Sequence, residues 1–173
     1  KLTASDGAAY DFFGSSVALN AAGDTAIVGA PWDNVGANTD RGSAYVFARS
    51  GGAWSQQAQL TASDGAAYDH FSRAVALNAA GDTAIVGAST HAVGANSEQG
   101  SAYVFTRGGG VWSQQAQLTA SDGAGVYWLG HSVALNAAGD TAIVGAYGSN
   151  VGANKYQGSA YVFARSGGVW SQQ

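Results

Sequence analysis

The sequence of 173 residues contains no cysteine, no methionine and a single proline. Without cysteine, neither a disulfide framework nor a thiolate metal site can form. Lys and Arg are scarce, 7 in all, and the net charge is -4, so the chain lacks the basic stripe that a nucleic-acid backbone requires. No apolar run approaches the roughly 18 residues of a membrane-spanning helix. These shortages argue against nucleic-acid binding and against a membrane span.

What the sequence has in abundance is self-similarity. The hexapeptide Leu-Thr-Ala-Ser-Asp-Gly begins at Leu2 and recurs at Leu60 and Leu118. The chain therefore divides into three repeats, 1–58, 59–116 and 117–173, which we treat as one array over 1–173. Repeats of this length are typical of architectures in which each unit buries its faces against its neighbours.

Four strand signals fit into each repeat. In repeat 1, Ser16–Asn20 and Thr25–Ala30 flank a turn cluster and read as one hairpin. Ser43–Ala48 and Trp54–Thr61 flank Ser-Gly-Gly and read as a second hairpin. Alanine is frequent, but no stretch shows the 3.6-residue period of an amphipathic helix. The sequence therefore predicts an all-β fold of four antiparallel strands per repeat.

The four predicted strands differ in polarity. Thr25–Ala30 and Ala44–Ala48 are apolar on both alternating faces, so they must be covered on both sides. The last strand alternates Trp54, Gln56 and Ala58 with polar residues, which indicates a half-wet outer strand. A sheet with dry inner strands and a polar outer strand, stacked on its own copies, is a β-propeller blade. A flat stacked solenoid is the alternative, and it would require capping repeats that the sequence lacks.

These repeats resemble a known family. Phe13-Gly14, Ser16-Val17-Ala18, Val28-Gly29-Ala30-Pro31 and Gly42–Phe47 are similar to the FG-GAP repeat, the blade motif of integrin α-subunit propellers and of many bacterial repeat proteins. Repeat 2 departs from it at Ser72, and repeat 3 at Leu129. The resemblance covers essentially the whole chain and implies a propeller fold, a binding role and an extracellular or cell-surface location.

Members of that family often carry a calcium loop in the first hairpin. Here Asn20 and Asp24 keep two of its ligand positions, but Ala22 and Val28 stand at two others, and the other two repeats have the same residues. Two ligands do not make a cage for a cation that takes 6–8 oxygens. We expect an Asx-type hydrogen-bonded turn instead, with no metal and no cofactor.

The positions that differ between copies concentrate in two windows of each repeat, 9–16 and 31–41 and their equivalents. Because blade strands run up and down, both windows should lie on one face, with the hairpin turns Asn20–Asp24 and Ser50–Trp54 on the other. Loops on a rigid scaffold are common sites of binding residues. We name the variable side the loop face. Its predicted ligand-binding residues are Tyr10, Asp11, Phe12, Ser15, Trp32, Asp33, Asp40 and Arg41 in repeat 1; Tyr68, Asp69, His70, Arg73, His91 and Glu98 in repeat 2; and Tyr127, Trp128, His131, Tyr147, Lys155 and Tyr156 in repeat 3.

Catalysis finds little support in this set. The histidines His70, His91 and His131 occupy different positions in their repeats, so we do not expect them to converge on a metal. No nucleophile–base motif is readable, and Asp11 and Asp33 are an unsupported acid pair. The favoured interpretation is a non-catalytic propeller module that binds a glycan or peptide through aromatic and polar side chains. A ligand-free self-assembling scaffold, natural or engineered, and a propeller glycosidase remain as alternatives.

Three blades cannot close a ring, because propellers usually have about 4–8. The chain also begins and ends within the predicted outer strand, with Lys1–Ala4 equivalent to its second half and Trp170–Gln173 to its first half. We therefore expect an obligate homodimer that forms one six-bladed propeller, each chain supplying half of it.

Overall fold

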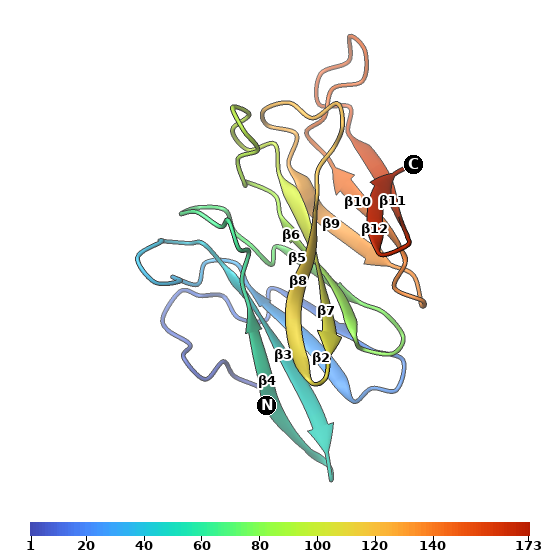
Figure 1. The fold of residues 1–173 in the computed structure, drawn as a ribbon. Coiled ribbons are helices and arrows are strands. Elements are labelled where there is room, and N and C mark those ends of the chain that lie inside the picture. The colour runs from blue at the N-terminus through green and yellow to red at the C-terminus, as the bar shows by residue number, and fades with distance from the viewer.

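The computed structural model describes residues 1–173 and consists of three four-stranded antiparallel sheets with no helix (Figure 1). Each sheet is built from one repeat and its strands follow in sequence order, so the predicted all-β class and the four strands per repeat are confirmed. We call the sheets blades 1 to 3. The strands are β1 (Ser16–Leu19), β2 (Thr25–Ala30), β3 (Ser43–Ser50), β4 (Ala53–Leu60), β5 (Ala74–Leu77), β6 (Thr83–Ala88), β7 (Ser101–Gly108), β8 (Val111–Leu118), β9 (Leu129–Leu135), β10 (Thr141–Ala146), β11 (Ser159–Ser166) and β12 (Val169–Gln172).

The first hairpin of each blade is closed by an asparagine side chain. Asn20 Oδ1 accepts hydrogen bonds from the backbone N–H groups of Asp24 and Thr25, both at 3.0 Å. Its Nδ2 donates to Asp24 Oδ1 at 2.8 Å, and Gly23 takes the left-handed φ of 67° that the turn needs. Asn78 and Asn136 make the same bonds in their own repeats. The predicted Asx-type turn is confirmed in all three blades.

The blades fan out from their first strands. β1 lies against β5 and β5 against β9, whereas the outer strands β4, β8 and β12 make little contact with one another. A register shift at Val46/Phe47 separates the two halves of the β3–β4 pairing, and the same shift recurs at Val104/Phe105. Because consecutive strands in each blade are antiparallel, the variable loops and the hairpin turns lie at opposite ends of the strands.

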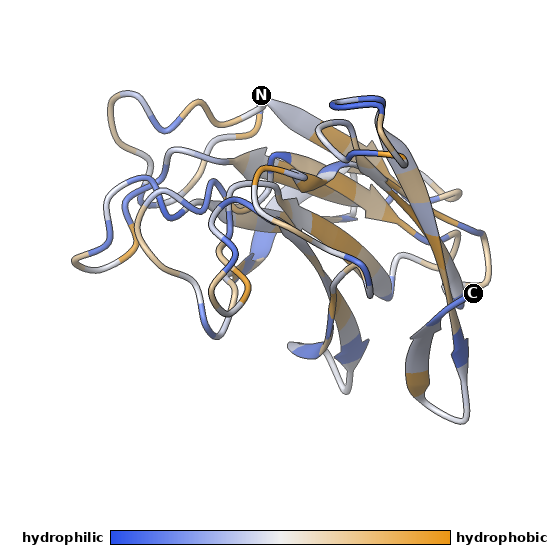
Figure 2. Cartoon of the chain, turned by 90° about the horizontal axis from the view of Figure 1, so that it is seen from above, coloured by the Kyte–Doolittle hydropathy of each residue, from blue (hydrophilic) through white to orange (hydrophobic).

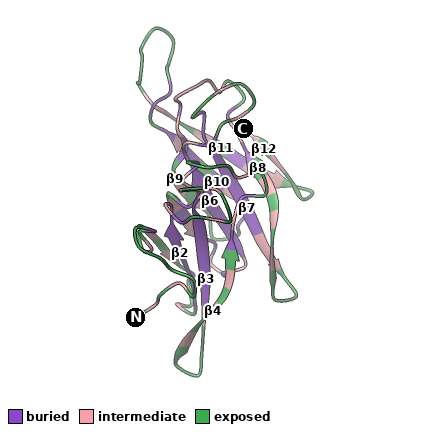
Figure 3. Cartoon of the chain, turned by 90° about the vertical axis from the view of Figure 1, so that its left-hand side faces the viewer, coloured by how far each residue is buried: buried purple, intermediate pink, exposed green.

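The core lies between the blades rather than within one sheet. β2 and β6 are buried at every residue, as their two-sided apolar sequence predicts (Figure 3). One apolar cluster joins Ile27 and Val46 of blade 1 to Val75 and Val86 of blade 2. A second cluster repeats this contact between blades 2 and 3. Seen from above, apolar residues follow the strands and hydrophilic stretches follow the loops (Figure 2).

Hydrogen bonds between loops connect each blade to the next. We call the segments before β1, β5 and β9 (1–15, 61–73 and 119–128) leading loops, and the β2–β3, β6–β7 and β10–β11 connections (31–42, 89–100 and 147–158) crossing loops. The backbone N–H of Tyr68 donates to Thr39 O, and that of Phe71 to Arg41 O, both at 2.9 Å. Blades 2 and 3 repeat this pattern. Leading and crossing loops thus share one face, as predicted.

No helix in the chain has the length and apolar character needed to cross a bilayer.

Candidate functional site

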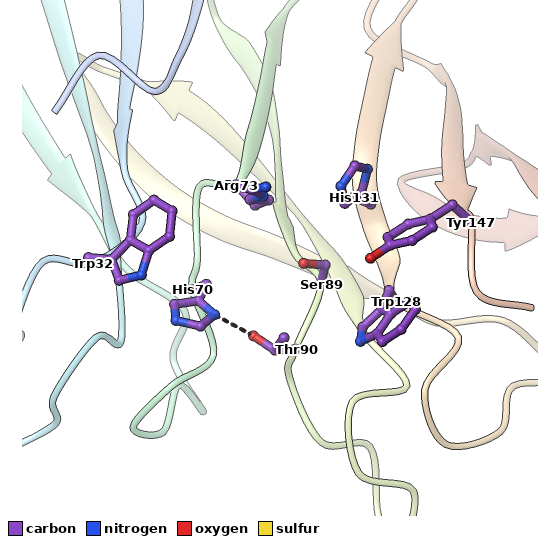
Figure 4. Close-up of a pocket in the computed structure, with 8 residues that line it drawn as sticks. All are labelled: Trp32, His70, Arg73, Ser89, Thr90, Trp128, His131 and Tyr147. Atoms are coloured by element: carbon purple, nitrogen blue, oxygen red, sulfur yellow. Dashed lines mark hydrogen bonds between the residues drawn. The ribbon is translucent and has the colours of Figure 1, made fainter. Parts of the chain in front are cut away.

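The loop face contains a cavity of about 360 Å³ to which all three repeats contribute (Figure 4). Its volume falls within the range of small-molecule sites, which is roughly 300–1,000 Å³. The crossing loop of blade 1 supplies one wall, blade 2 the floor and blade 3 the opposite wall. The lining residues are Trp32, His70, Arg73, Ser89, Thr90, Trp128, His131 and Tyr147.

Aromatic rings form the two facing walls of the cavity. On one side Trp32 packs against Phe12, with ring centroids 4.9 Å apart, and against His70 at 5.5 Å. On the other side Trp128 stacks on Tyr147 at 4.8 Å with an interplanar angle of 20°. The Trp128 indole N–H donates to Glu98 Oε2 at 2.9 Å. Both walls are therefore held in place by neighbours before any ligand arrives.

Arg73 is the only charged side chain in the lining, and no carboxylate lines the cavity. Its guanidinium lies over the Trp32 ring, 5.6 Å from the centroid. Burial lowers the pKa of His131, and the Arg73 charge lowers it further. Burial also lowers the pKa of His70, against the opposing charge of Asp40. His70 and His131 are thus neutral at pH 7, and Arg73 gives the cavity its positive charge.

The hydrogen bonds of Thr90 fix the tautomer of His70. The Thr90 hydroxyl donates its single proton to the carbonyl of Tyr68 at 2.7 Å. His70 Nδ1 lies 3.0 Å from the same hydroxyl oxygen, so Nδ1 must be the donor. In the neutral ring, Nε2 is then the acceptor. The base nitrogen of His70 therefore does not activate the Thr90 hydroxyl.

The loop-face backbone is held in an uncommon conformation at equivalent positions of all three repeats. Left-handed φ values occur at Phe12 (53°), His70 (48°) and Trp128 (54°), which are equivalent residues. Ten non-glycine residues have positive φ, and all ten lie in the variable windows. Such values are rare for bulky side chains and cluster at functional sites. The scaffold thus imposes the same loop shape on different side chains.

The structure brings together six of the predicted site residues and leaves others elsewhere. Trp32, His70, Arg73, Trp128, His131 and Tyr147 line the cavity. Around it on the same face, at least partly exposed, are Tyr10, Phe12, Ser15, Asp40, Tyr68, Glu98, Lys155 and Tyr156. Arg41 instead reaches under the next leading loop, where its guanidinium donates to Ala62 O at 2.5 Å. Its position argues for a structural role.

Five predicted site residues are buried, and the expectation that they face a ligand is corrected. Asp11 and Asp69 each accept a hydrogen bond from a backbone N–H three residues earlier, which closes the leading loop. Asp33 accepts from the hydroxyls of Ser43 and Tyr45. Buried carboxylates need such partners, so these side chains support the loops. The buried residues are Asp11, Asp33, Asp69, His91 and Tyr127.

His91 sits between two carboxylates below the loop face. Its Nδ1 hydrogen-bonds Asp69 Oδ2 at 2.9 Å, and its Nε2 lies 3.5 Å from Asp64 Oδ2. Tyr103 donates to the other Asp64 oxygen at 2.8 Å. Burial alone would lower the pKa of His91, but the Asp69 hydrogen bond and the charges of both aspartates outweigh it and raise the pKa. Asp33 holds the equivalent position in repeat 1.

Two of the three histidines share the cavity, although they belong to no group of side chains placed to hold a metal ion. His70 and His131 line one cavity although they stand at different positions in their repeats, because the leading loop of blade 2 and the start of β9 in blade 3 both reach it. Ser89 and Thr90 were missed, since small hydroxyl side chains in a variable window carry no signal of their own. The one available clue was that their equivalents in other repeats, Tyr147 and Trp32, are aromatic.

The hairpin turns do not fit a calcium ion. Asn20 Oδ1 is already used by two backbone N–H groups, and Asp24 Oδ1 accepts from Asn20 and from the Thr25 hydroxyl. Ala22 and Val28 offer no side-chain oxygen. No group of three or more His, Asp or Glu side chains in the chain is placed to hold a metal ion. The prediction that the protein needs no metal stays a prediction.

Comparison with solved structures shows the fold. Saccharomyces cerevisiae Sqt1 aligns with a TM-score of 0.54 at 12% identity, covering 95% of this chain and 35% of that protein. The periplasmic gluconolactonase PpgL of Pseudomonas aeruginosa aligns with a TM-score of 0.53 at 18% identity, covering 87% of this chain and 39% of that protein. The chain thus spans little more than a third of each.

Comparison by sequence identifies the family. Among curated proteins none matches the chain. The family model described as FG-GAP repeat matches residues 1–47, 54–105 and 112–163, one match for each blade. The matched segments hold the motif residues, the Asx hairpins and most of the loop face. The chain therefore belongs to the FG-GAP repeat family of β-propeller blades.

Proposed function

We propose that the protein is a non-catalytic binding module whose loop-face cavity holds an acidic sugar residue of a glycan. The observation that carries the proposal is one cavity with facing aromatic walls, Trp32 against the Trp128–Tyr147 stack, and a single positive charge from Arg73. The proposal refines the broader expectation of a glycan or peptide ligand.

The chemistry of the lining suits a pyranose ring. An indole face buries the apolar C–H face of a sugar at low entropic cost, because the ring has only two side-chain torsions. Polar groups then set the orientation, and here Ser89, Thr90 and the two neutral histidines offer donors and acceptors. The Arg73 guanidinium can bind a carboxylate with two parallel hydrogen bonds. The absence of any lining carboxylate leaves this charge free for an acidic ligand.

The same lining supports a binding role over a glycosidase role. Glycoside hydrolysis generally uses two carboxyl groups on either side of the scissile bond. Glu98 is hydrogen-bonded to the Trp128 indole, and Asp69 is buried with His91. FG-GAP repeats are typically non-enzymatic and extracellular, and a glycan ligand would be met outside the cell. The gluconolactonase likeness, at 18% identity, is a likeness of fold.

The proposal is tested by titrating the protein with 3′-sialyllactose and with an oligogalacturonide, against lactose as the neutral match. We expect calorimetry to show binding of an acidic probe and at least tenfold weaker binding of lactose. Trp32→Ala and Trp128→Ala should each reduce affinity by about tenfold or more, as anchors in a pocket do. Tyr10→Ala is the matched control, since this aromatic is 83% exposed on the same face outside the cavity.

Two results would contradict the proposal. One is an affinity for the acidic probes that both tryptophan variants leave unchanged. The other is a failure to bind any acidic glycan on an array, together with selection of a defined peptide from a displayed library. The second result would keep a binding role for the loop face and replace the ligand class.

A further inference from the structure

The first and last blades each leave one apolar sheet face uncovered. On blade 3, Ile143 is 46% exposed and Val162 is 39% exposed, although the equivalent pair in blade 1, Ile27 and Val46, is fully buried. On blade 1, Val17 is 68% exposed and Leu19 is 61% exposed. Their equivalents in blade 2 are buried beneath blade 1. The structure thus ends in two apolar faces of different composition.

These two faces are the two halves of a contact that the chain already makes twice. Between blades 1 and 2, the Ile27 and Val46 side packs against the Val75 and Leu77 side. Between blades 2 and 3, Ile85 and Val104 pack against the next blade in the same way. The uncovered face of blade 3 corresponds to the Ile27 and Val46 side of this contact. The uncovered face of blade 1 corresponds to the Val75 and Leu77 side. Each face therefore fits the other face of another copy.

A glycine beneath each crossing loop marks the same missing neighbour. At Gly29 an added Cβ would collide with the Ser16 hydroxyl of its own blade and also with the Ser72 carbonyl in the leading loop of blade 2. At Gly87 it would collide with the Gly130 carbonyl of blade 3. At Gly145 it would meet only the Ser132 side chain of its own blade. Within the chain, the next blade approaches Gly29 and Gly87 closely, and no neighbouring blade approaches Gly145.

Backbone groups at the two end blades lack the hydrogen bonds that their equivalents make between blades. The carbonyls of Thr39 and Arg41 accept hydrogen bonds from the leading loop of blade 2, and those of Ser97 and Gln99 from that of blade 3. The equivalent carbonyls of Lys155 and Gln157 accept no backbone hydrogen bond. The N–H groups of Tyr10 and Phe13, equivalent to the donors Tyr68 and Phe71, donate none to a backbone carbonyl.

We propose that the occupant of both faces is a second copy of this chain, and that two copies close a six-bladed ring with twofold symmetry. The third blade of each chain docks on the first blade of the other, so two identical interfaces form. Six is the multiple of three blades that falls within the usual range of about 4–8. Closed twofold assemblies are the commonest oligomers. The ring places Gly14 of one copy over Gly145 of the other and carries two loop-face cavities, whatever these bind.

The direct test is the mass of the 173-residue chain in solution, measured by light scattering across a size-exclusion peak at micromolar concentration. We expect twice the chain mass of 17.3 kDa. A folded monomer, whose end faces are then left to further blades or other partners, would overturn the proposal. A particle of three or more chains would also overturn it.

A glycine substitution tests the interface itself. Ser132→Ala copies the alanine that repeat 2 has at this position and should keep the dimer. Ser132→Ala combined with Gly145→Ala adds a Cβ that its own blade tolerates and that a docked Gly14 would not. We expect the double variant to show a twofold lower mass. A double variant that retains the dimer mass would overturn the proposed docking.

Because a separated chain could lose its fold, a mixing experiment completes the test. Ile143→Lys and Leu19→Glu each place a charge on one end face, and we expect each variant alone to lose the dimer. Mixed in equal amounts, they should recover the dimer mass, since one interface is then native and the other joins Lys to Glu. Val111→Lys, at a residue 69% exposed and away from both faces, should stay dimeric. A mixture that recovers no dimer would overturn the head-to-tail pairing.

Discussion

The Asn78–Asp82 turn and the crossing loop 89–100 lie at opposite ends of the same strand, β6, and tolerate change very differently. The turn has the same sequence in all three repeats, and its side chains close it by hydrogen bonds. In the loop, Ser89, Thr90 and His91 stand where repeat 1 has Pro, Trp and Asp. Backbone bonds join the loop to the next blade, and these do not depend on side-chain identity.

The two ends of β6 thus differ in whether side chains or backbone groups make the hydrogen bonds that hold them. The backbone groups that join a crossing loop to the neighbouring leading loop bond to each other, so the exposed side chains of the loop face can change without orphaning a buried polar group. The buried carboxylates Asp11, Asp33 and Asp69 are the exceptions. At the hairpin turns, the side chain of Asn78 itself satisfies buried N–H groups. Substitutions that remove polar atoms should therefore be costly at the hairpin turn and cheap at the exposed positions of the loop face.

The largest effect is expected from Asn78→Ala. The asparagine is buried, and its loss leaves the N–H groups of Asp82 and Thr83 without their acceptor. We expect the free energy of unfolding to fall by about 2 kcal/mol. Urea unfolding measures this change. Asn34→Ala is the control on the loop face: Asn34 Oδ1 also accepts a backbone hydrogen bond, from the Asp40 N–H at 2.9 Å, but this bond is exposed, so water can replace the lost acceptor. Repeat 2 already has alanine at this position, and a loss as large as that of Asn78→Ala would contradict the contrast between the two ends of the strand.

A gain of stability is expected at Val126. This β-branched residue has a left-handed φ of 65°, a conformation that costs an L-residue roughly 1–2 kcal/mol. Val126→Asn should relieve part of that strain and raise the free energy of unfolding by about 1 kcal/mol. Val126→Thr keeps the branched Cβ and should show no such gain. Equal stabilities for the two variants would mean that the loop backbone is not strained there.

Much of the fold was predictable because the repeats are nearly identical. The apolar pattern of Thr25–Ala30 and the Asn-to-Asp hairpin gave strand positions to within a residue or two. The sequence did not reveal which polar loop residues are buried. From the sequence, Asp11 and Trp32 are equally plausible ligand-binding residues. In the structure, Asp11 accepts a hydrogen bond from Ala8, whereas Trp32 lines the cavity. That difference depends on loop conformation, which the alternation of side chains does not encode.

A smaller effect is expected from the buried His91. Because its folded pKa is raised by Asp69 and Asp64, its protonated form stabilises the fold. This contribution is fully present below the unfolded pKa of about 6.5 and is lost as pH rises through the folded pKa. The difference in melting temperature between the wild type and His91→Gln should therefore be larger at pH 5.5 than at pH 8.5. A difference that grows toward alkaline pH would contradict the assignment.

No effect is expected from calcium. The hairpin oxygens are committed to the Asx network, and alanine and valine replace two ligand positions. A thermal melt in millimolar calcium should match one in chelator within experimental error. A chelator-reversible rise of many degrees would show that the hairpin face binds metal after all.

A loop exchange measures whether the loop face binds its ligand independently of the fold. Both variable windows of repeat 1 are placed together into repeats 2 and 3, where the grafted Asp33 again meets a serine and a tyrosine, because all three repeats share the residues equivalent to its partners Ser43 and Tyr45. The account predicts a melting temperature within a few degrees of the wild type and loss of affinity for the acidic oligosaccharide that the wild type binds. Retained affinity would contradict the assignment of binding to the loop face. A much lower melting temperature would show that the loop sequences are needed for the fold.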